Sequence, residues 1–197
     1  TFELTGIAVG STTFVIAIMH EGHADYTSMP IYVEVEEEHI ECTGTDGDLN
    51  NDSSINILDV TSLVAVLVGY DNWSNECQQE YADMNEDGNI NVLDVVMIID
   101  IITGVRNDYA TNIIFEKTSS GALFDSDGVI GAIEMIILHE NDFIFNITNN
   151  ALLSNYKTTQ NRTHLIVVNP NSNEIFSSIG EYQIEKAVAA SNNGFIS

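Results

Sequence analysis

Apolar and polar positions follow one another in three different ways along the chain. In residues 1–42 the segments STTFVIAIMH and MPIYVEVEEE run apolar or alternate as strands do, on either side of the turn-like EGHADYTS. Between residues 43 and 104 two apolar segments, ILDVTSLVAVLVG and VLDVVMIIDIITG, each stop at a glycine, as helices do. After residue 106 short strand-like segments return, separated by clusters of Asn, Ser and Gly. The pattern predicts a mainly β, multi-domain chain with a small all-α centre.

These zones set the expected domains: a β-hairpin over residues 1–42, a loop-helix domain over 43–105 and an antiparallel β-sandwich over 106–197. Forty residues cannot bury the core of a sandwich alone. The first strands are therefore expected to pair with the C-terminal sheet, to complete a neighbouring subunit by strand addition, or to belong to a domain outside this segment.

Each helical segment is preceded by nearly the same dodecamer. DLNNDSSINILD runs from Asp48 to Asp59, and DMNEDGNINVLD runs from Asp83 to Asp94. Calcium takes oxygen ligands, and a twelve-residue loop can surround it with ligands at positions one, three, five, seven, nine and twelve. These positions hold Asp48, Asn50, Asp52, Ser54, Asn56 and Asp59, and then Asp83, Asn85, Asp87, Asn89, Asn91 and Asp94. The spacing predicts two calcium loops, and the alternative is a pair of Asx-rich turns that merely cap helices.

The sixth loop position requires a sharp bend with positive φ, which glycine adopts without cost. Gly88 stands there in the second copy, and Ser53 in the first. A non-glycine residue in this conformation costs about 1 kcal/mol, so the first site is expected to be the weaker one. Ile55 and Ile90 stand at the eighth position, where we expect a short β-bridge between the loops.

The chain carries thirty acidic and five basic residues, for a net charge of −25, and no Lys or Arg precedes residue 106. Repulsion from phosphate argues against nucleic acid or an anionic membrane as a partner. Acidic side chains without cationic neighbours must be solvated, screened or bound to metal, which agrees with calcium. No segment approaches the length of a membrane span, so no membrane insertion is expected.

Residues 43–104 resemble a dockerin module, whose hallmark is a pair of D-x-N-x-D-G-x-I-N-x-x-D loops, each followed by one helix. The second copy matches fully, and the first departs from the pattern at Ser53. The resemblance implies a non-catalytic extracellular module that folds around two calcium ions and docks onto a cohesin β-sandwich. It also implies that the two residues before the last acidic ligand help to choose the partner. These are Ile57 and Leu58 in the first copy and Val92 and Leu93 in the second.

The flanking regions show weaker resemblances. GVIGAIEMIILHENDFIF resembles a strand pair of a cohesin-like sandwich, and the N-terminal hairpin resembles the last strands of an immunoglobulin-like domain. The two helices are apolar almost all round, so something must cover the surface left after they pack together. That cover is a cohesin-like β-sandwich of the same chain, of a neighbouring copy, or of another protein. Head-to-tail contact between copies would give a homopolymer unless a ring closes.

Cys42 and Cys77 bracket the first dodecamer. A disulfide between them would suit an exported protein, and two free buried thiols are the alternative. In a dockerin-like module with a connector this long between its repeats, Cys77 would tie back to Cys42. An extracellular or cell-surface location is expected on these grounds.

Three other clusters of polar residues give weaker indications of a functional site. His20 and His23 in HEGHAD are three residues apart, whereas the zinc-protease helix needs a spacing of four, so a solvated hairpin tip is expected. DSDG, at 125–128, is expected to be a plain turn before a strand, and the EVEEE run a solvated acidic linker. No nucleophile elbow, phosphate loop or Ser/His/Asp set occurs, and no enzyme is expected.

Three functions remain from the sequence. The first is a secreted calcium-binding module for cell-surface adhesion or scaffold assembly through a dockerin–cohesin type interaction. The second is a self-assembling structural subunit of an extracellular filament or surface layer. The third is a non-catalytic appendage of a secreted hydrolase whose catalytic domain lies outside this segment.

Overall fold

The structure, a computed structural model, describes residues 8–35, 41–104 and 108–196. It divides into two compact units, Thr1–Glu41 and Cys42–Ser197. In the described ranges it is mainly β with three helices. The expected mainly-β chain with a small helical centre is thus confirmed in outline.

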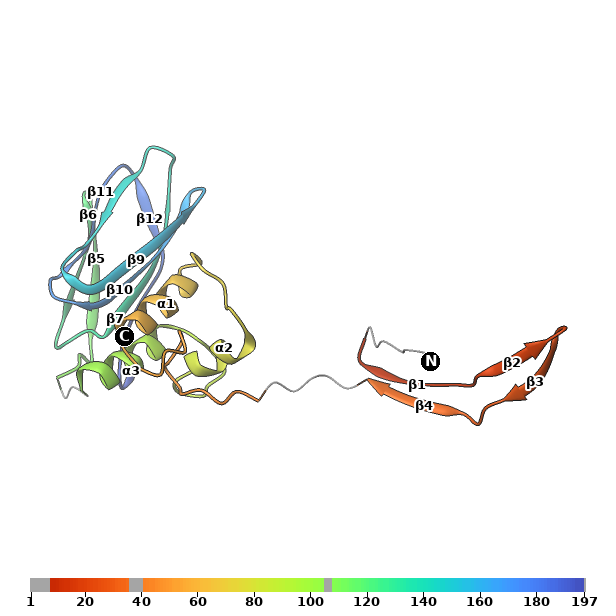
Figure 1. Cartoon of the computed structure of the whole chain (residues 1–197). Coiled ribbons are helices and arrows are strands. Elements are labelled where there is room, and N and C mark those ends of the chain that lie inside the picture. Colours follow the sequence, from red (N-terminus) through yellow and green to blue (C-terminus); the bar gives the residue numbers. More distant parts are fainter. Residues whose placement is uncertain (1–7, 36–40, 105–107, 197) are drawn as a thin grey trace. The chain divides into compact units, whose positions relative to one another are not determined.

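The first unit is a long hairpin, drawn in red and orange in Figure 1. Strand β1 (Gly10–Phe14) pairs with β4 (Ile31–Val35), and β2 (Ala17–His20) pairs with β3 (His23–Thr27), both antiparallel. The turn is tighter than expected, because Glu21 and Gly22 both adopt positive φ, at 47° and 84°. A two-residue turn of this kind matches the twist of the strands it joins. Residues of EGHADYTS that were expected to form a wide turn therefore form β3.

The helices of the second unit are α1 (Ile57–Leu67), α2 (Glu76–Ala82) and α3 (Val92–Thr103). Helices α1 and α3 begin within the dodecamers, at the N-caps Asn56 and Asn91. They end close to the predicted glycines, and Gly69 and Gly104 have φ of 86° and 87°. The connector between the two repeats, residues 70–82, carries a helix that was not predicted from the sequence. Within it α2 forms, with Asn75 as an N-cap that accepts a hydrogen bond from the Gln78 N–H at 2.9 Å.

Two antiparallel sheets make up the rest of the second unit. The five-stranded sheet has the order β13-β12-β7-β10-β9, and the four-stranded sheet has the order β5-β6-β11-β8. The strands are β5 (Ile113–Thr118), β6 (Gly121–Ser126), β7 (Ala132–His139), β8 (Ile144–Ile147), β9 (Ala151–Thr159), β10 (Arg162–Pro170), β11 (Glu174–Ile179), β12 (Tyr182–Ser191) and β13 (Gly194–Ile196).

The five-stranded sheet is buried on both faces over part of its area, and β10 shows why. Leu165 and Val167 point into a core enclosed by the two sheets, with residues such as Ile133 and Phe176. Ile166 and Val168 point the opposite way, into a second core that they share with the helices. Successive side chains of a strand alternate between faces, so an apolar run such as LIVV can serve two cores at once.

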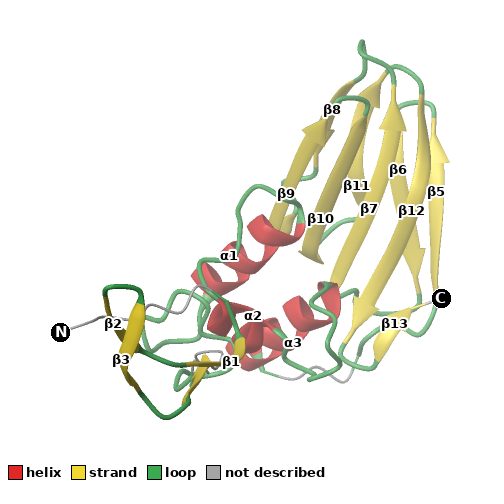
Figure 2. Ribbon diagram, turned by 90° about the vertical axis from the view of Figure 1, so that its right-hand side faces the viewer, coloured by secondary structure: helices red, strands yellow, loops and turns green. Residues whose placement is uncertain are grey.

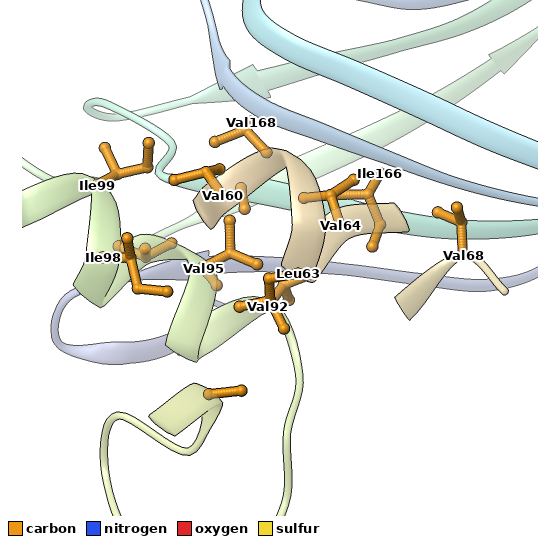
Figure 3. Close-up of a cluster of buried hydrophobic side chains, with 14 of the residues drawn as sticks. Val60, Leu63, Val64, Val68, Val92, Val95, Ile98, Ile99, Ile166 and Val168 are labelled. Carbon is orange, nitrogen blue, oxygen red and sulfur yellow. The ribbon is translucent and has the colours of Figure 1, made fainter. Parts of the chain in front are cut away.

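The second core, which we call the shared core, joins the helical segment to the sheet. Helix α3 contacts β7, β10 and β12, and α1 contacts β9 and α3 (Figure 2). Figure 3 shows Val60 and Val64 of α1, with the C-cap residue Val68, gathered with Ile166 and Val168 of β10. The boundary expected between residues 105 and 106 falls inside this compact unit. The division into three domains stays a prediction, but these two segments pack as one body.

Candidate metal centre

The first carboxylate of each dodecamer loop holds the loop closed through backbone N–H groups. The two oxygens of Asp48 accept from the N–H groups of Asp52, at 3.1 Å, and of Ser53, at 2.8 Å. Asp83 does the same with Asp87, at 3.2 Å, and with Gly88, at 2.8 Å. Each oxygen has a further lone pair, so these bonds position the carboxylate without using up its capacity to bind a cation.

The last carboxylate of each loop joins the loop to its helix. Asp59 accepts from the Leu49 and Asn56 N–H groups, both at 2.9 Å. Asp94 is the third residue of α3 and completes a capping box with Asn91, just as Asp59 does with Asn56 in α1. Both carboxylates are fully buried. The sequence departs here from the glutamate of the standard EF-hand motif, and the shorter aspartate is the residue that closes the capping box.

The middle positions repeat the same hydrogen bonds in both copies. In the first loop the Asn50 side-chain oxygen accepts from the Asp52 N–H at 2.9 Å, and Asp52 accepts from the Ser54 N–H at 2.9 Å. The Asn56 amide donates to the Ser54 carbonyl at 3.0 Å. The equivalent bonds of the second loop join the equivalent residues, which are Asn85, Asp87, Asn89 and Asn91.

The backbone bends at the predicted position in both loops. Ser53 has φ of 68° and Gly88 has φ of 79°, both in the left-handed region. Asn51 and Glu86, two residues earlier, also have positive φ, at 58° and 55°. The first loop therefore holds two non-glycine residues in a conformation that side chains disfavour, and the second loop holds one. The expected β-bridge does not form, although Ile55 and Ile90 both pack against the shared core.

The electrostatics of the loops favour a bound cation. Burial raises the pKa of Asp94 above its usual value, against the lowering effect of backbone hydrogen bonds, and the nearby Asp83 charge raises the pKa further. Hydrogen bonds from Asn89 hold the pKa of Asp87 below its usual value. No Lys or Arg lies in the sequence before residue 106 to offset these charges. A divalent cation would relieve the repulsion that acts on Asp94.

The donor set fits calcium in its chemistry. Each loop offers carboxylate, amide and carbonyl oxygens and no nitrogen or sulfur, as a hard cation requires. In the described part of the chain, no three His, Cys, Asp or Glu side chains stand close enough together to hold a metal by themselves. Half of the predicted ligands of each loop are of other kinds, namely asparagine side chains and a backbone carbonyl.

The predicted partner-binding residues lie in different surroundings. Ile57 and Leu58 of the first copy are 37% and 57% exposed. In the second copy Val92 is only 1% exposed, and Leu93 packs against the shared core. The duplicated pair is therefore open to a partner in the first repeat, whereas Val92 has no surface to offer.

Cys42 and Cys77 form a disulfide, with their Cα atoms 5.3 Å apart. It ties the segment that enters the first loop to α2, which precedes the second loop. Between these ends, Gly44 donates its N–H to the Tyr81 hydroxyl at 2.6 Å. Tyr81 also accepts from the Gly47 N–H through its carbonyl at 2.8 Å, and the Gln78 amide donates to the Leu49 carbonyl at 3.1 Å. The connector between the repeats is thus fastened to the start of the helical segment at several neighbouring points.

The other sequence candidates do not assemble into sites. His20 and His23 are exposed partners across the tight turn of the first unit. Asp127 of the DSDG turn accepts hydrogen bonds from the backbone and side chains of Thr111 and Asn112. That carboxylate fastens the segment before β5, as a plain structural turn does. The EVEEE run lies largely outside the described residues.

Residues of the five-stranded sheet that cover the helices were not identified individually from sequence. They are Ala132, Leu153, Ile166, Val168 and Ala190. Lys157 of β9 also reaches the Gly69 carbonyl at the C-terminal end of α1. The feature of the sequence that could have indicated them is the unbroken apolar run of β10, because such a run is typical of a strand buried on both faces.

The loops and helices define a tandem loop-helix module with an oxygen-only donor set in each repeat. A family model described as the dockerin type I domain matches residues 46–103, which are 58 of the 197 residues. This segment is a dockerin module. Dockerin domains are non-catalytic modules that bind calcium and interact with cohesins. Comparisons with curated proteins and with solved structures gave no match. No helix in the described ranges is long and apolar enough to cross a membrane.

Proposed function

We propose that the protein is an extracellular calcium-dependent module for adhesion or scaffold assembly, acting through a dockerin–cohesin type interaction. The observation that carries the proposal is the repetition of one hydrogen-bond network in two loops, down to the buried Asp59 and Asp94. In each loop the last carboxylate is buried and accepts a hydrogen bond from a backbone N–H ten residues earlier in the chain. Burying a carboxylate is costly, and an Asx-rich turn that only caps a helix would not need it.

Each loop takes one ion in this proposal. The ligands are Asp48, Asn50, Asp52, the Ser54 carbonyl, Asn56 and Asp59, and then Asp83, Asn85, Asp87, the Asn89 carbonyl, Asn91 and Asp94. A bound calcium ion supplies positive charge at the centre of each loop. The buried carboxylate then holds both the loop and the first turn of the helix. In the second loop, for example, Asp94 accepts hydrogen bonds from the N–H groups of Met84, the second loop residue, and of Asn91, the N-cap.

The C-terminal region is proposed as the cohesin-like partner within the same chain. Its five-stranded sheet covers the apolar sides of α1 and α3, as an interaction within one chain would require. The exposed pair Ile57 and Leu58 remains for a second partner, which is another protein or a neighbouring copy. The module thus has an occupied face and an open face.

Assembly into a filament is a second candidate, favoured by the hairpin of the first unit. Large apolar side chains of this hairpin are exposed, including Met19 of β2 at 59% and Tyr32 of β4 at 61%, and Met29 at 84% in the segment between β3 and β4. Monomeric proteins rarely expose contiguous apolar patches of this kind without a partner. Strand addition between copies would cover them.

One sample measured by circular dichroism and light scattering, with excess calcium and then with EGTA, tests these proposals. We expect EGTA to remove helix signal and calcium to restore it. A helix signal that ignores EGTA contradicts the calcium-dependent module. A particle that stays the size of one chain in calcium contradicts the filament.

A further inference from the structure

The outer face of the five-stranded sheet is only half covered by the helices. Where β10 enters the shared core, Val168 pairs with Ala132 and Leu153. At the other end of the same strand, Arg162 pairs with Thr159, and His164 pairs with Lys157. A cavity of about 560 Å³ lies at this end and is bounded by Val68, the C-cap residue that follows α1. We call it the cationic groove.

The groove concentrates positive charge on a very acidic chain. Lys157 and Arg162 line it together with His164, and no Asp or Glu side chain lines it in the described ranges. Glu185 pairs with Arg162 at 2.8 Å and Glu134 accepts from His164 at 3.0 Å, so Lys157 is the lining cation without a carboxylate partner among the described residues. Two of the five Lys and Arg residues of the whole sequence therefore share one cavity, whereas the chain carries a net charge of −25. At physiological ionic strength charges farther away than about 8 Å are largely screened. The charges that act inside the groove are therefore Lys157, Arg162 and the carboxylate of Glu185 that pairs with Arg162.

The two cations have donors to spare. Arg162 gives its Nε to Glu185 at 2.8 Å, and its terminal amino groups have no partner in the part of the chain that the structure describes. Lys157 donates to the Gly69 carbonyl, which occupies one of its three N–H donors. A guanidinium with a free edge matches the geometry of a carboxylate.

The remaining lining suits hydroxyl groups better than a hydrophobic ligand. Thr159, Gln160 and Asn161 are exposed and supply hydroxyl and amide groups at the tip of the β9–β10 hairpin. Tyr70 stands beside the groove with 64% of its surface exposed, and Lys157 Nζ lies 6.0 Å from its ring centre. An exposed aromatic ring can cover the apolar face of a sugar while polar groups hold its hydroxyls.

We propose that the cationic groove binds an acidic saccharide, with a sugar-acid carboxylate placed against Arg162 and Lys157. The cavity volume lies within the range of small-ligand sites. This site is distinct from the calcium loops and from the exposed Ile57 and Leu58. It gives an adhesion module a direct contact with a charged polysaccharide, independent of any protein partner.

Calorimetric titration of the full chain in calcium with trigalacturonate tests the proposal. The trimer should bind, and its methyl ester, which keeps the rings but loses the charge, should bind at least about tenfold more weakly. Arg162→Gln should weaken binding of the trimer by about three- to tenfold. Lys117→Gln is the matched control, because it removes the same charge from a different cavity, and should change binding by less than about twofold.

Three results would overturn the proposal. They are no binding of the trimer, equal binding of the trimer and its ester, and equal losses in the Arg162 and Lys117 variants. Hexaglutamate is titrated in parallel, and binding of this peptide in preference to the trimer would assign the groove to acidic peptides instead. A circular dichroism spectrum of Arg162→Gln that matches the parent shows that any loss of binding is not a loss of fold. Arg162 is exposed and outside both cores, so this match is expected.

Discussion

The shared core predicts that a substitution far from the calcium ligands weakens calcium binding. Val167 and Val168 are neighbours on β10, both fully buried, but they point into different cores. Replacing either by alanine removes two methyl-sized groups. At about 0.8 kcal/mol for each group, plus a term for the cavity left behind, the cost is about 2 kcal/mol in either variant.

Only the cost at Val168 falls on the packing of the helices against the sheet. If calcium orders the helical segment, that packing energy is part of the observed calcium affinity. A loss of about 2 kcal/mol lowers the product of two binding constants by about twenty- to thirtyfold. For two ions that bind together, the calcium midpoint should therefore rise about fivefold in Val168→Ala. In Val167→Ala it should stay near that of the parent chain.

The assay follows the far-ultraviolet helix signal against free calcium in EGTA-buffered solutions. Thermal unfolding in excess calcium is measured alongside, and both variants should lose stability there. Equal midpoint shifts in the two variants would refute the reasoning, because they would show that general destabilisation matters and the shared core does not. No shift in either variant would show that the helices fold around calcium without help from the sheet.

Three further predictions concern the loops, the disulfide and a surface turn. Ser53→Gly should strengthen calcium binding by about fivefold, since it removes about 1 kcal/mol of backbone strain, and direct calcium titration that shows no gain would contradict this. Replacing Cys42 and Cys77 by serine opens a loop of 35 residues and should cost about 3–4 kcal/mol in a calcium-bound unfolding experiment; a loss below about 1 kcal/mol would show that the connector is held by other contacts. Hydrogen bonds from Thr111 and Asn112 strongly lower the pKa of Asp127, so its contribution is present above the unfolded pKa and is lost as the pH falls. The melting temperature of the parent should therefore drop more than that of Asp127→Asn between about pH 5 and about pH 3; parallel curves would rule this out.

Sequence was informative wherever the physical constraint is local. A twelve-residue calcium loop requires oxygen ligands at fixed offsets and a bend at the sixth position. Both dodecamers carry oxygen-bearing residues at those offsets, and both bend at the sixth position. The two helices that follow the loops could be located in the sequence because each is a continuous, mostly apolar segment and a glycine marks its C-terminal end. Even the strain at Ser53 followed from one residue type at one position, and its φ of 68° agrees with it.

Sequence was less informative where the outcome depends on short or distant contacts. Helix α2 has seven residues and no long apolar stripe, and its local signals were only Asn75 and the following Glu76. The tight turn at Glu21 places a non-glycine residue at positive φ, which residue preferences argue against. The surface that covers α1 and α3 is formed by strands that lie far along the chain from these helices. The apolar pattern of the helices could therefore indicate that a cover is needed but could not identify the strands that provide it.

The sheet also explains why two nearly identical repeats do not have the same surroundings. The final carboxylates Asp59 and Asp94 are equally buried, so the two loops meet the same local demand. One residue earlier the repeats diverge, because Leu58 is exposed and Leu93 packs against the shared core. A sheet on one side of a duplicated module cannot contact both copies in the same way. The duplication therefore supplies two loops of like geometry, but of the two apolar pairs that precede the last carboxylate only the first, Ile57 and Leu58, has both of its side chains exposed.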